Sequence, residues 1–278
     1  MRRFLQVARR VLVVSRVAWS WFGPVVALRF LLLLPVLATN RKGLPWAYDC
    51  LGTVSFKHPF EGRRLYWFHP DLGFIREIFE QRDYTGRPGM EIGKDDIVVD
   101  VGAHVGVFTV FAAAQASRGR VVSVEANGAL FGRLLKNISA NALTNVTAVH
   151  AALAPSEGEA TLWHGIRGNS SDSLVSRTTT KGELVATISP AALMARHHLE
   201  TVDFLKLDIE GAEYQIFSGD LSWLSRVRRV AMEAHGGYGD PTALAERFKN
   251  EGFQVYYRPI TGPYGTDALI YAIRLNAA

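Results

Sequence analysis

The chain has 278 residues, of which 48% are hydrophobic and 21% are charged, a composition typical of a globular protein and not of a disordered one. Its formal net charge is +5, but eight cations and no acid precede Asp49, so the rest of the chain is slightly acidic. That distribution disfavours nucleic acid as a partner. The single cysteine, Cys50, excludes a disulfide framework and a cysteine zinc site, and it fits a reducing, cytosolic setting.

Residues 1–48 form a basic and strongly apolar N-terminal segment. Arg16 and Arg29 bound an apolar stretch that Gly23-Pro24 interrupts, whereas a membrane span needs about 20 uncharged residues. Arginines, tryptophans and leucines in one segment favour a helix that lies in the membrane interface, peripheral on the cytoplasmic face. Two alternatives remain open: a helix packed on the domain or used in dimerisation, and a span or signal peptide.

Residues 49–92 are interpreted as a cap region that precedes the main domain. Val54–Phe68 has a β-like pattern bounded by glycine turn signals. Asp71 can cap a following helix, in which apolar residues recur at helical spacing. We expect this region to cover the site, since it carries no recognisable chemistry of its own.

Residues 93–278 alternate strands and helices, which predicts an α/β fold. The last two strands are separated by a short turn with no room for a helix, so they should form an antiparallel hairpin. We therefore predict a seven-stranded, mostly parallel sheet with a reversed last strand. The expected strands are Ile97–Val101, Val121–Glu125, Val146–Val149, Val202–Leu207, Val227–Glu233, Phe253–Tyr257 and Leu269–Ile273, with helices from about Gly106, over about Gly128–Asn141, after Asp208 and after Asp240-Pro241.

A glycine turn follows the first of these strands, in the stretch Asp100–Gly106. A dinucleotide fingerprint needs Gly where this chain has His104, whereas an acid ending the strand suits an amine-bearing ligand such as S-adenosylmethionine. Glu125 closes the next strand about twenty residues later, where a carboxylate can bind two ribose hydroxyls. The alternative is an ordinary α/β turn that binds no ligand.

Three carboxylates follow another strand, in the stretch Lys206–Glu213. Open α/β sheets bind ligands at the carboxyl ends of their strands, so Asp208 should point into the crevice. Glu210 can lie close by, hold a metal or take a proton, and Glu213 can cap its helix. The alternative for Glu210 and Glu213 is that they only stabilise a helix N-terminus.

His235 ends the next strand on the same side of the predicted sheet. A histidine beside acids is a reasonable general base for a hydroxyl, and a structural histidine is the alternative. The polar loop Asn169–Ser173 either borders the ligand or is simply solvated. His197 and His198 are interpreted as surface residues.

These stretches, with the Asn137–Asn141 helix and the Ser170–Ser173 loop, resemble the FkbM family of S-adenosylmethionine-dependent methyltransferases over roughly residues 70–275. The resemblance implies a class I, Rossmann-like methyltransferase fold and methyl transfer to a hydroxyl oxygen, usually of a sugar or polyketide. His104 departs from the family, which more often has Asn there. The residues predicted to bind S-adenosylmethionine are Asp100, Gly102, Ala103, His104, Gly106, Phe108, Thr109, Glu125, Ala126, Asn127 and Asp208.

The predicted function is therefore O-methylation of a sugar, which a lipid or a natural product can carry. Because the sulfonium is a good leaving group, the enzyme must mainly align oxygen, methyl and sulfur and remove a proton. His235 is the first choice of base. Asp208 with Glu210 is the second, with a divalent ion as an option and no metal ligands assigned.

Two other classes compete with this prediction. A nicotinamide-dependent oxidoreductase is disfavoured because His104 replaces a fingerprint glycine. A non-catalytic methyltransferase-like module that scaffolds a membrane complex is disfavoured because Asp100, Glu125 and Asp208 are intact. The expected partners are a small-molecule, sugar or glycolipid acceptor and a membrane surface, with the oligomeric state left open.

Overall fold

The computed structural model describes residues 53–57, 64–68, 72–165, 172–176, 179–262 and 265–275. The N-terminal segment, the Asp71 cap and most of the polar loop lie outside the described residues, so the predictions made for them stay predictions. Within the described part, the helices are too short or too polar for any of them to span a membrane.

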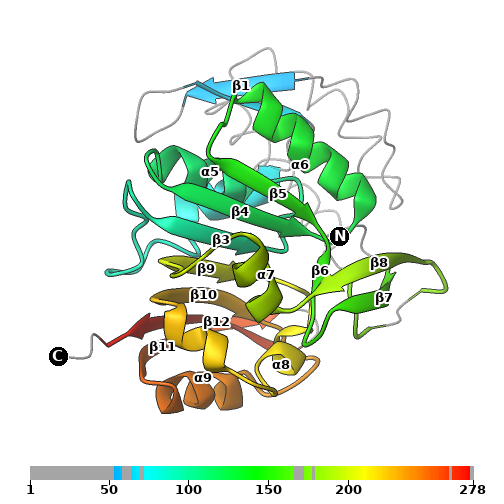
Figure 1. The fold of residues 1–278 in the computed structure, drawn as a ribbon, viewed down its shortest axis with the longest axis vertical. Helices are drawn as coiled ribbons and strands as arrows, with labels where there is room; N and C mark the ends of the chain where they lie inside the picture. Colours follow the sequence, from blue (N-terminus) through cyan, green and yellow to red (C-terminus); the bar gives the residue numbers. More distant parts are fainter. Residues whose placement is uncertain are drawn as a thin grey trace, which may run out of the picture.

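A seven-stranded sheet forms the centre of the described fold (Figure 1). Its strand order is β11-β12-β10-β9-β3-β4-β5, and each pairing is parallel except the two that β12 makes. This confirms the predicted α/β fold and the reversed last strand. The strands are β3 (Ile97–Val101), β4 (Arg120–Glu125), β5 (Val146–His150), β9 (Phe204–Leu207), β10 (Arg229–Ala234), β11 (Phe253–Gly262) and β12 (Gly265–Arg274).

Helices cover both faces of this sheet, which explains why its central strands β3, β4 and β9 are rich in apolar residues. Along β3, Val98 packs into one apolar cluster with α5, while Val99 and Val101 pack into a second cluster with α7 and α9. Asp240 caps α9 as predicted, accepting a hydrogen bond from the Thr242 amide at 2.9 Å. The helices are α5 (Val107–Gln115), α6 (Gly128–Ala140), α7 (Pro190–Arg196), α8 (Glu213–Ile216), α9 (Pro241–Asn250) and the 3-10 helix η3 (Ser222–Arg226).

The cap region forms the predicted β-hairpin and then a short helical segment. Strands β1 (Thr53–Lys57) and β2 (Arg64–Phe68) pair antiparallel. The Asn141 side chain, at the end of α6, accepts a hydrogen bond from the Tyr66 amide at 2.8 Å and donates one to its carbonyl at 2.7 Å. These two hydrogen bonds of Asn141 therefore connect the hairpin to α6 of the main domain.

The helix predicted after Asp71 is partly a π-helix. Its first turn is α4 (Leu72–Ile75), and η1 (Arg76–Gln81) continues with wider turns until Arg82 enters the left-handed region at φ 52°. Ile78 and Phe79 of η1 are buried in the same apolar cluster as Phe111 of α5. The cap region thus shares one core with the main domain.

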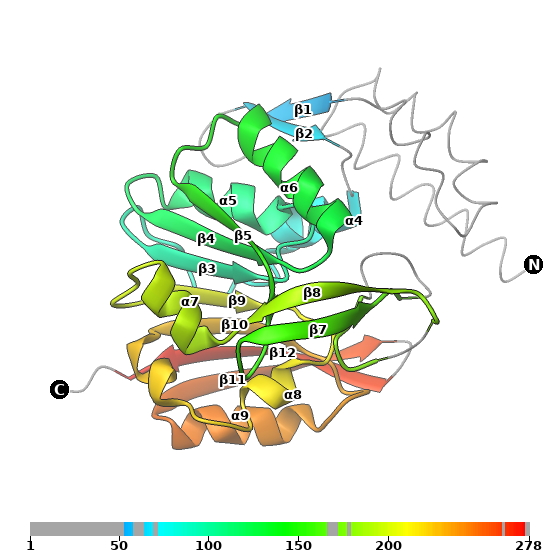
Figure 2. The same ribbon diagram turned by 45° about the vertical axis from the view of Figure 1, so that its right-hand side comes forward.

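A small three-stranded sheet, which the sequence analysis did not predict, extends beyond β5 (Figure 2). It consists of β6 (Ala152–Leu153), β7 (Gly158–Trp163) and β8 (Gly182–Ile188), in the order β6-β8-β7. Only Leu162 of β7 is buried, so that strand lacks a continuous apolar pattern. This sheet matters because its buried side reaches the site described below.

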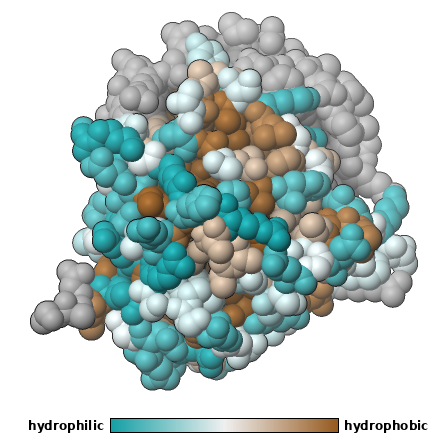
Figure 3. Space-filling model, in the orientation of Figure 1, coloured by the Kyte–Doolittle hydropathy of each residue, from teal (hydrophilic) through white to brown (hydrophobic). Residues whose placement is uncertain are grey.

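Polarity is unevenly distributed over the face seen in Figure 1. Apolar residues gather in the upper half of that face, where β5 and α6 lie, and polar residues cover the lower half around α9 (Figure 3). Leu135 of α6 is 45% exposed and Leu184 of β8 is 67% exposed. Single exposed leucines such as these two are ordinary on a protein surface.

Candidate active site

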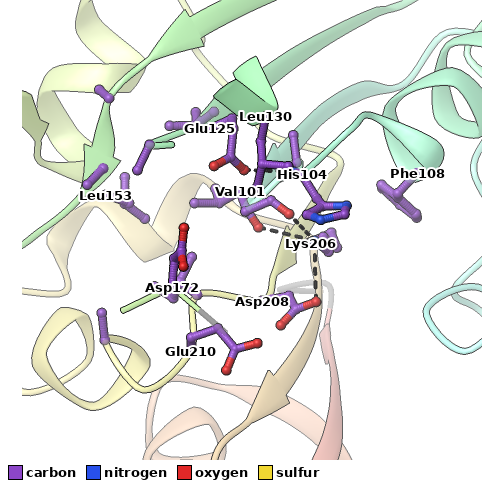
Figure 4. Close-up of a pocket in the computed structure, with 18 of the residues that line it drawn as sticks. Val101, His104, Phe108, Glu125, Leu130, Leu153, Asp172, Lys206, Asp208 and Glu210 are labelled. Carbon is purple, nitrogen blue, oxygen red and sulfur yellow. Dashed lines mark hydrogen bonds and ion pairs between the residues drawn. The ribbon is translucent and has the colours of Figure 1, made fainter. Parts of the chain in front are cut away.

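A cleft opens at the carboxyl ends of β3, β4 and β9, where the strand order departs from β3 in both directions (Figure 4). It encloses about 900 Å³ of empty space when its open mouth is included. Glu125 lies at one end, and Asp208 with Glu210 lies at the other. The predicted residues that line the cleft are Gly102, Ala103, His104, Phe108, Glu125, Ala126, Asp208 and Glu210.

The glycine turn after β3 forms one wall of this cleft. Gly102 has φ 72°, and a methyl group on its α-carbon would overlap the Asp208 carbonyl oxygen. The Gly102 and Ala103 amides both donate to the Val124 carbonyl at 3.0 Å, which ties the turn to β4. Glycine is therefore required because the end of β9 passes against the turn.

Asp100 does not line the cleft, although it was predicted to bind the cofactor. Its side chain is fully buried, and its Oδ2 accepts a hydrogen bond from the Thr109 hydroxyl at 2.6 Å. Its Oδ1 lies 3.4 Å from the Lys206 ammonium. Asp100 and Thr109 are therefore buried behind the turn, outside the lining of the cleft.

Gly106 and Asn127 also stand behind the lining. Gly106 precedes α5, has φ 87° and adjoins Leu134 of α6. The absence of a side chain at Gly106 therefore lets α5 and α6 pack closely. Asn127 caps α6, accepting from the amides of its first turn, and its side-chain amide donates to Asp172 at 2.6 Å. Since Asp172 lines the cleft, Asn127 positions a residue of the loop that the sequence had marked as polar.

Glu125 is only 7% exposed and faces the cleft. Its two oxygens accept hydrogen bonds from the His104 amide at 2.7 Å and the Asn127 amide at 2.8 Å. Burial raises the pKa of Glu125 to about 7, against the opposing effect of those two amides. Each oxygen keeps a further lone pair, so the carboxylate can still accept from two ligand hydroxyls.

His104 occupies the middle of the turn, where the sequence departs from the resembled family. Burial, with the charge of Lys206, lowers the pKa of His104 to about 4, so its ring is neutral. The buried Nδ1 atom has no hydrogen-bond partner within the described residues, and the ring packs against Phe74 at a centroid distance of 4.6 Å. This unpaired nitrogen lies at the cleft wall.

Lys206 lines the cleft, and the sequence analysis gave it no role. Its buried ammonium donates to the Gly102 carbonyl at 2.8 Å and lies between Asp100, at 3.4 Å, and Asp208, at 3.8 Å. Burial lowers the pKa of Lys206, but the two carboxylates outweigh it and raise the value. The signal available was a lysine inside an otherwise apolar strand, which is buried only when it is paired.

Tyr84, from the cap region, is the second residue that the sequence analysis missed. Its hydroxyl donates to Asp208 Oδ2 at 3.0 Å, and its ring lines the cleft. Burial and the Asp208 charge raise the pKa of Tyr84, so it stays a hydrogen-bond donor. The cap region, expected to carry no chemistry, therefore contributes one polar group to the site.

His235 does not itself line the cleft, but it lies beside Asp208 and Glu210, which do. Its Nε2 lies 3.5 Å from Glu210 Oε2 and 3.9 Å from Asp208 Oδ1. Its Nδ1 lies 3.0 Å from Oε1 of the fully buried Glu213, which also accepts from the Ile209 and Gly211 amides. Glu213 thus fixes both the loop after β9 and the histidine ring.

The electrostatics of this cluster are dominated by its carboxylates. Burial lowers the pKa of His235, but the hydrogen bond with Glu213 and the neighbouring charges raise it to about 11. Burial and the Asp208 charge raise the pKa of Glu210 to about 8, and the same two causes raise that of Glu233 to about 8. The imidazole is therefore cationic at neutral pH in this arrangement, and it can act as a base only once that proton is gone.

Comparison with known proteins identifies the family. Residues 100–255, more than half of the chain, match the model of the methyltransferase FkbM domain. The glycine turn, Glu125 and the Asp208–Glu213 stretch all lie inside that match, whereas Tyr84 lies outside it.

Three curated proteins show the range of relatives. The AMB antimetabolite synthetase AmbE of Pseudomonas aeruginosa is 26% identical over 243 residues, covering 72% of this chain but only 11% of its own length. The hexuronic acid methyltransferase AglP of Haloferax volcanii is 27% identical, over 59% of this chain and 68% of AglP. The 31-O-demethyl-FK506 methyltransferase FkbM of Streptomyces tacrolimicus is 26% identical, over 65% of this chain and 80% of that enzyme.

Two solved structures that match part of the chain come from Methanococcus jannaschii. The fibrillarin pre-rRNA processing protein is 13% identical with a TM-score of 0.47, and covers 80% of this chain and 89% of its own. TYW2 in complex with AdoMet is 16% identical with a TM-score of 0.42, over 80% and 87% of the two chains. The family match and the strand order agree with the fold expected from the sequence, and they leave no support for the nicotinamide-dependent alternative. The chain belongs to the FkbM family of S-adenosylmethionine-dependent methyltransferases.

Proposed function

We propose that this protein transfers a methyl group from S-adenosylmethionine to a hydroxyl oxygen of a sugar. The observation that carries the proposal is one cleft with a buried carboxylate, Glu125, at one end and Asp208 and Glu210, which lie beside His235, at the other. The names of two relatives support the acceptor class, because one acts on a hexuronic acid and the other forms an O-methyl group.

The cleft walls fit the parts of the cofactor in turn. Glu125 can accept from the two ribose hydroxyls, and the backbone of Gly102 and Ala103 lines the part of the cleft that we assign to the methionine portion. Leu130, Leu153 and Leu162 line an apolar region that suits the adenine ring. In this proposal the methionine part of the cofactor contacts the backbone of the turn. Asp100, which was predicted to contact it directly, is buried behind that turn.

The chemistry asked of the protein is positioning and proton removal. When bound, the cofactor supplies an electrophilic methyl group on a sulfonium. The oxygen–carbon bond forms as the carbon–sulfur bond breaks, which yields a methyl ether, a neutral thioether and one proton. The acceptor hydroxyl would approach next to Asp208, Glu210 and His235. We therefore assign to these three residues the task of making removal of the hydroxyl proton easier.

We further propose that the acceptor sugar is carried on a lipid or a natural product and is met at the cytoplasmic face of a membrane. Support comes from the composition of residues 1–48, with eight cations and no acid. Basic and apolar residues together favour binding to anionic lipid surfaces.

The test is transfer of labelled methyl from S-adenosylmethionine to uronic acid glycosides, with Glu125→Ala beside wild type. We expect a product 14 Da heavier whose label is in a base-stable ether, and loss of both cofactor binding and transfer in the variant. Glu159→Gln, on exposed β7, is the matched control. Failure of wild type to bind S-adenosylmethionine in calorimetry, or label found only on nitrogen or carbon, would overturn the proposal.

A further inference from the structure

We infer that Asp208, Glu210 and His235 together bind one divalent metal ion at the acceptor end of the cleft. The role of that ion rests on the proposed O-methyl transfer, whereas the site itself rests on the geometry of these three side chains. The sequence analysis considered His235 and the acidic pair as competing bases. The fold makes them one cluster.

The three residues converge because β9 and β10 are parallel neighbours, so their carboxyl ends meet at one edge of the sheet. Asp208 follows the end of β9, Glu210 follows two residues later, and His235 follows the end of β10. One ligating atom from each lies within 4.8 Å of those of the other two. Backbone pairing of the two strands therefore sets the spacing of the cluster.

The distances inside the cluster fit a cation better than they fit hydrogen bonds. His235 Nε2 lies 3.5 Å from Glu210 Oε2 and 3.9 Å from Asp208 Oδ1, both beyond the usual 2.7–3.2 Å of an N–H···O bond. Two ligands that share a metal at bond lengths of about 2.1 Å lie roughly 3 to 4 Å apart. Both imidazole–carboxylate distances therefore fit coordination of one shared ion.

The remaining atoms of the cluster are held in place by other residues. His235 Nδ1 is paired at 3.0 Å with Glu213, whose side chain is fully buried, so Nε2 faces the two carboxylates. Asp208 Oδ2 accepts from the Tyr84 hydroxyl, so Oδ1 faces His235. A histidine that is oriented by a second carboxylate behind it is the usual arrangement of a metal-ligating imidazole.

Access and ligand type indicate what kind of ion would bind. The Asp208 and Glu210 side chains are 19% and 27% exposed, so an ion can enter from the cleft and keep open positions. One imidazole with two carboxylates suits a divalent ion of the first transition row, such as Mn²⁺. An acceptor hydroxyl bound in an open position would lose its proton to solvent more easily, which prepares the oxygen for methyl transfer.

The test is titration of Mn²⁺ alone into full-length protein that has been treated with chelator and dialysed. Calorimetry and the Mn²⁺ electron paramagnetic resonance signal should show one ion per chain with a micromolar dissociation constant. We expect Glu210→Gln and His235→Ala to weaken binding at least tenfold, and Glu213→Gln to weaken it about 10–100-fold. His197→Ala and Glu159→Gln, both away from the cleft, should bind Mn²⁺ as wild type does.

Thermal unfolding of each metal-free variant establishes that it is folded, and Glu210→Gln is the most informative because Glu210 is partly exposed. Absence of Mn²⁺ binding to wild type, or binding that Glu210→Gln and His235→Ala leave unchanged, overturns the inference. Titration of S-adenosylmethionine with chelator present separates the two proposals. If the cofactor binds and Mn²⁺ does not, only the metal site fails, whereas loss of cofactor binding refutes the methyltransferase assignment itself.

Discussion

Glu125 is the residue whose ionisation should be visible in cofactor binding. Its pKa is raised from 4.5 to about 7, so the folded protein keeps this proton to a higher pH than the unfolded chain does. The contribution of this group to the free energy of unfolding is therefore fully present below pH 4.5 and is lost as the pH rises through about 7. Ribose hydroxyls donate better to the ionised carboxylate, so the affinity for the cofactor should instead increase as the pH rises through about 7.

We expect the affinity for S-adenosylmethionine to rise about tenfold from pH 6 to pH 8, following the ionised fraction of a group with a pKa near 7. Calorimetry at pH 6, 7 and 8 checks this. Glu125→Gln should bind more weakly and lose the slope, while Glu159→Gln should keep it. An equal slope in Glu125→Gln would show that another group is responsible.

Tyr84 should act as a positioning residue for Asp208. Tyr84→Phe removes one hydrogen bond to a charged acceptor, worth about 1.5–3 kcal/mol. We expect kcat to fall about tenfold or more while the KM for S-adenosylmethionine changes less than twofold. Steady-state kinetics checks this, with Tyr257→Phe, partly exposed on β11, as the control. Equal losses of kcat and thermal stability would mean that Tyr84 only supports the fold.

The turn after β3 has no space for a side chain at Gly102. Gly102→Ala places a methyl group against the Asp208 carbonyl at a backbone φ of 72°, so we expect the free energy of unfolding to fall by more than about 3 kcal/mol. Gly132→Ala, in the middle of α6 with open space around it, should instead raise it by about 0.5–1 kcal/mol. Urea unfolding of both variants checks the contrast, and similar midpoints would contradict it.

Elements with regular apolar patterns were predictable, and the small sheet was not. The buried strands β3, β4 and β9 read as apolar runs because both of their faces are covered. Strand β7 has one buried residue and β8 has three, and their pairing joins residues 19 to 29 positions apart. Their sequence carries no local signal strong enough to distinguish a strand from a polar loop.

Charge is divided between two parts of the whole molecule, since eight cations precede Asp49 and the remainder is slightly acidic. We expect the full chain to co-sediment with vesicles that contain phosphatidylserine and not with neutral vesicles. Each basic residue near an anionic surface contributes about 1 kcal/mol, so replacing Arg2, Arg3, Arg9 and Arg10 by Gln should weaken binding roughly a thousandfold. Equal binding by that variant would refute the electrostatic part of the membrane proposal.

The α/β fold, the reversed last strand and the two polar stretches after β3 and β9 could be predicted, because strand periodicity, glycine turns and acids at strand ends are local features. The positions of those side chains relative to one another follow only from the tertiary fold. It buried Asp100 behind the turn, paired Lys206 with two carboxylates, brought Tyr84 from the cap region to Asp208, and joined His235 to Asp208 and Glu210. These contacts join segments up to 124 positions apart, and their distances follow from strand pairing and core packing, which no short stretch of sequence records.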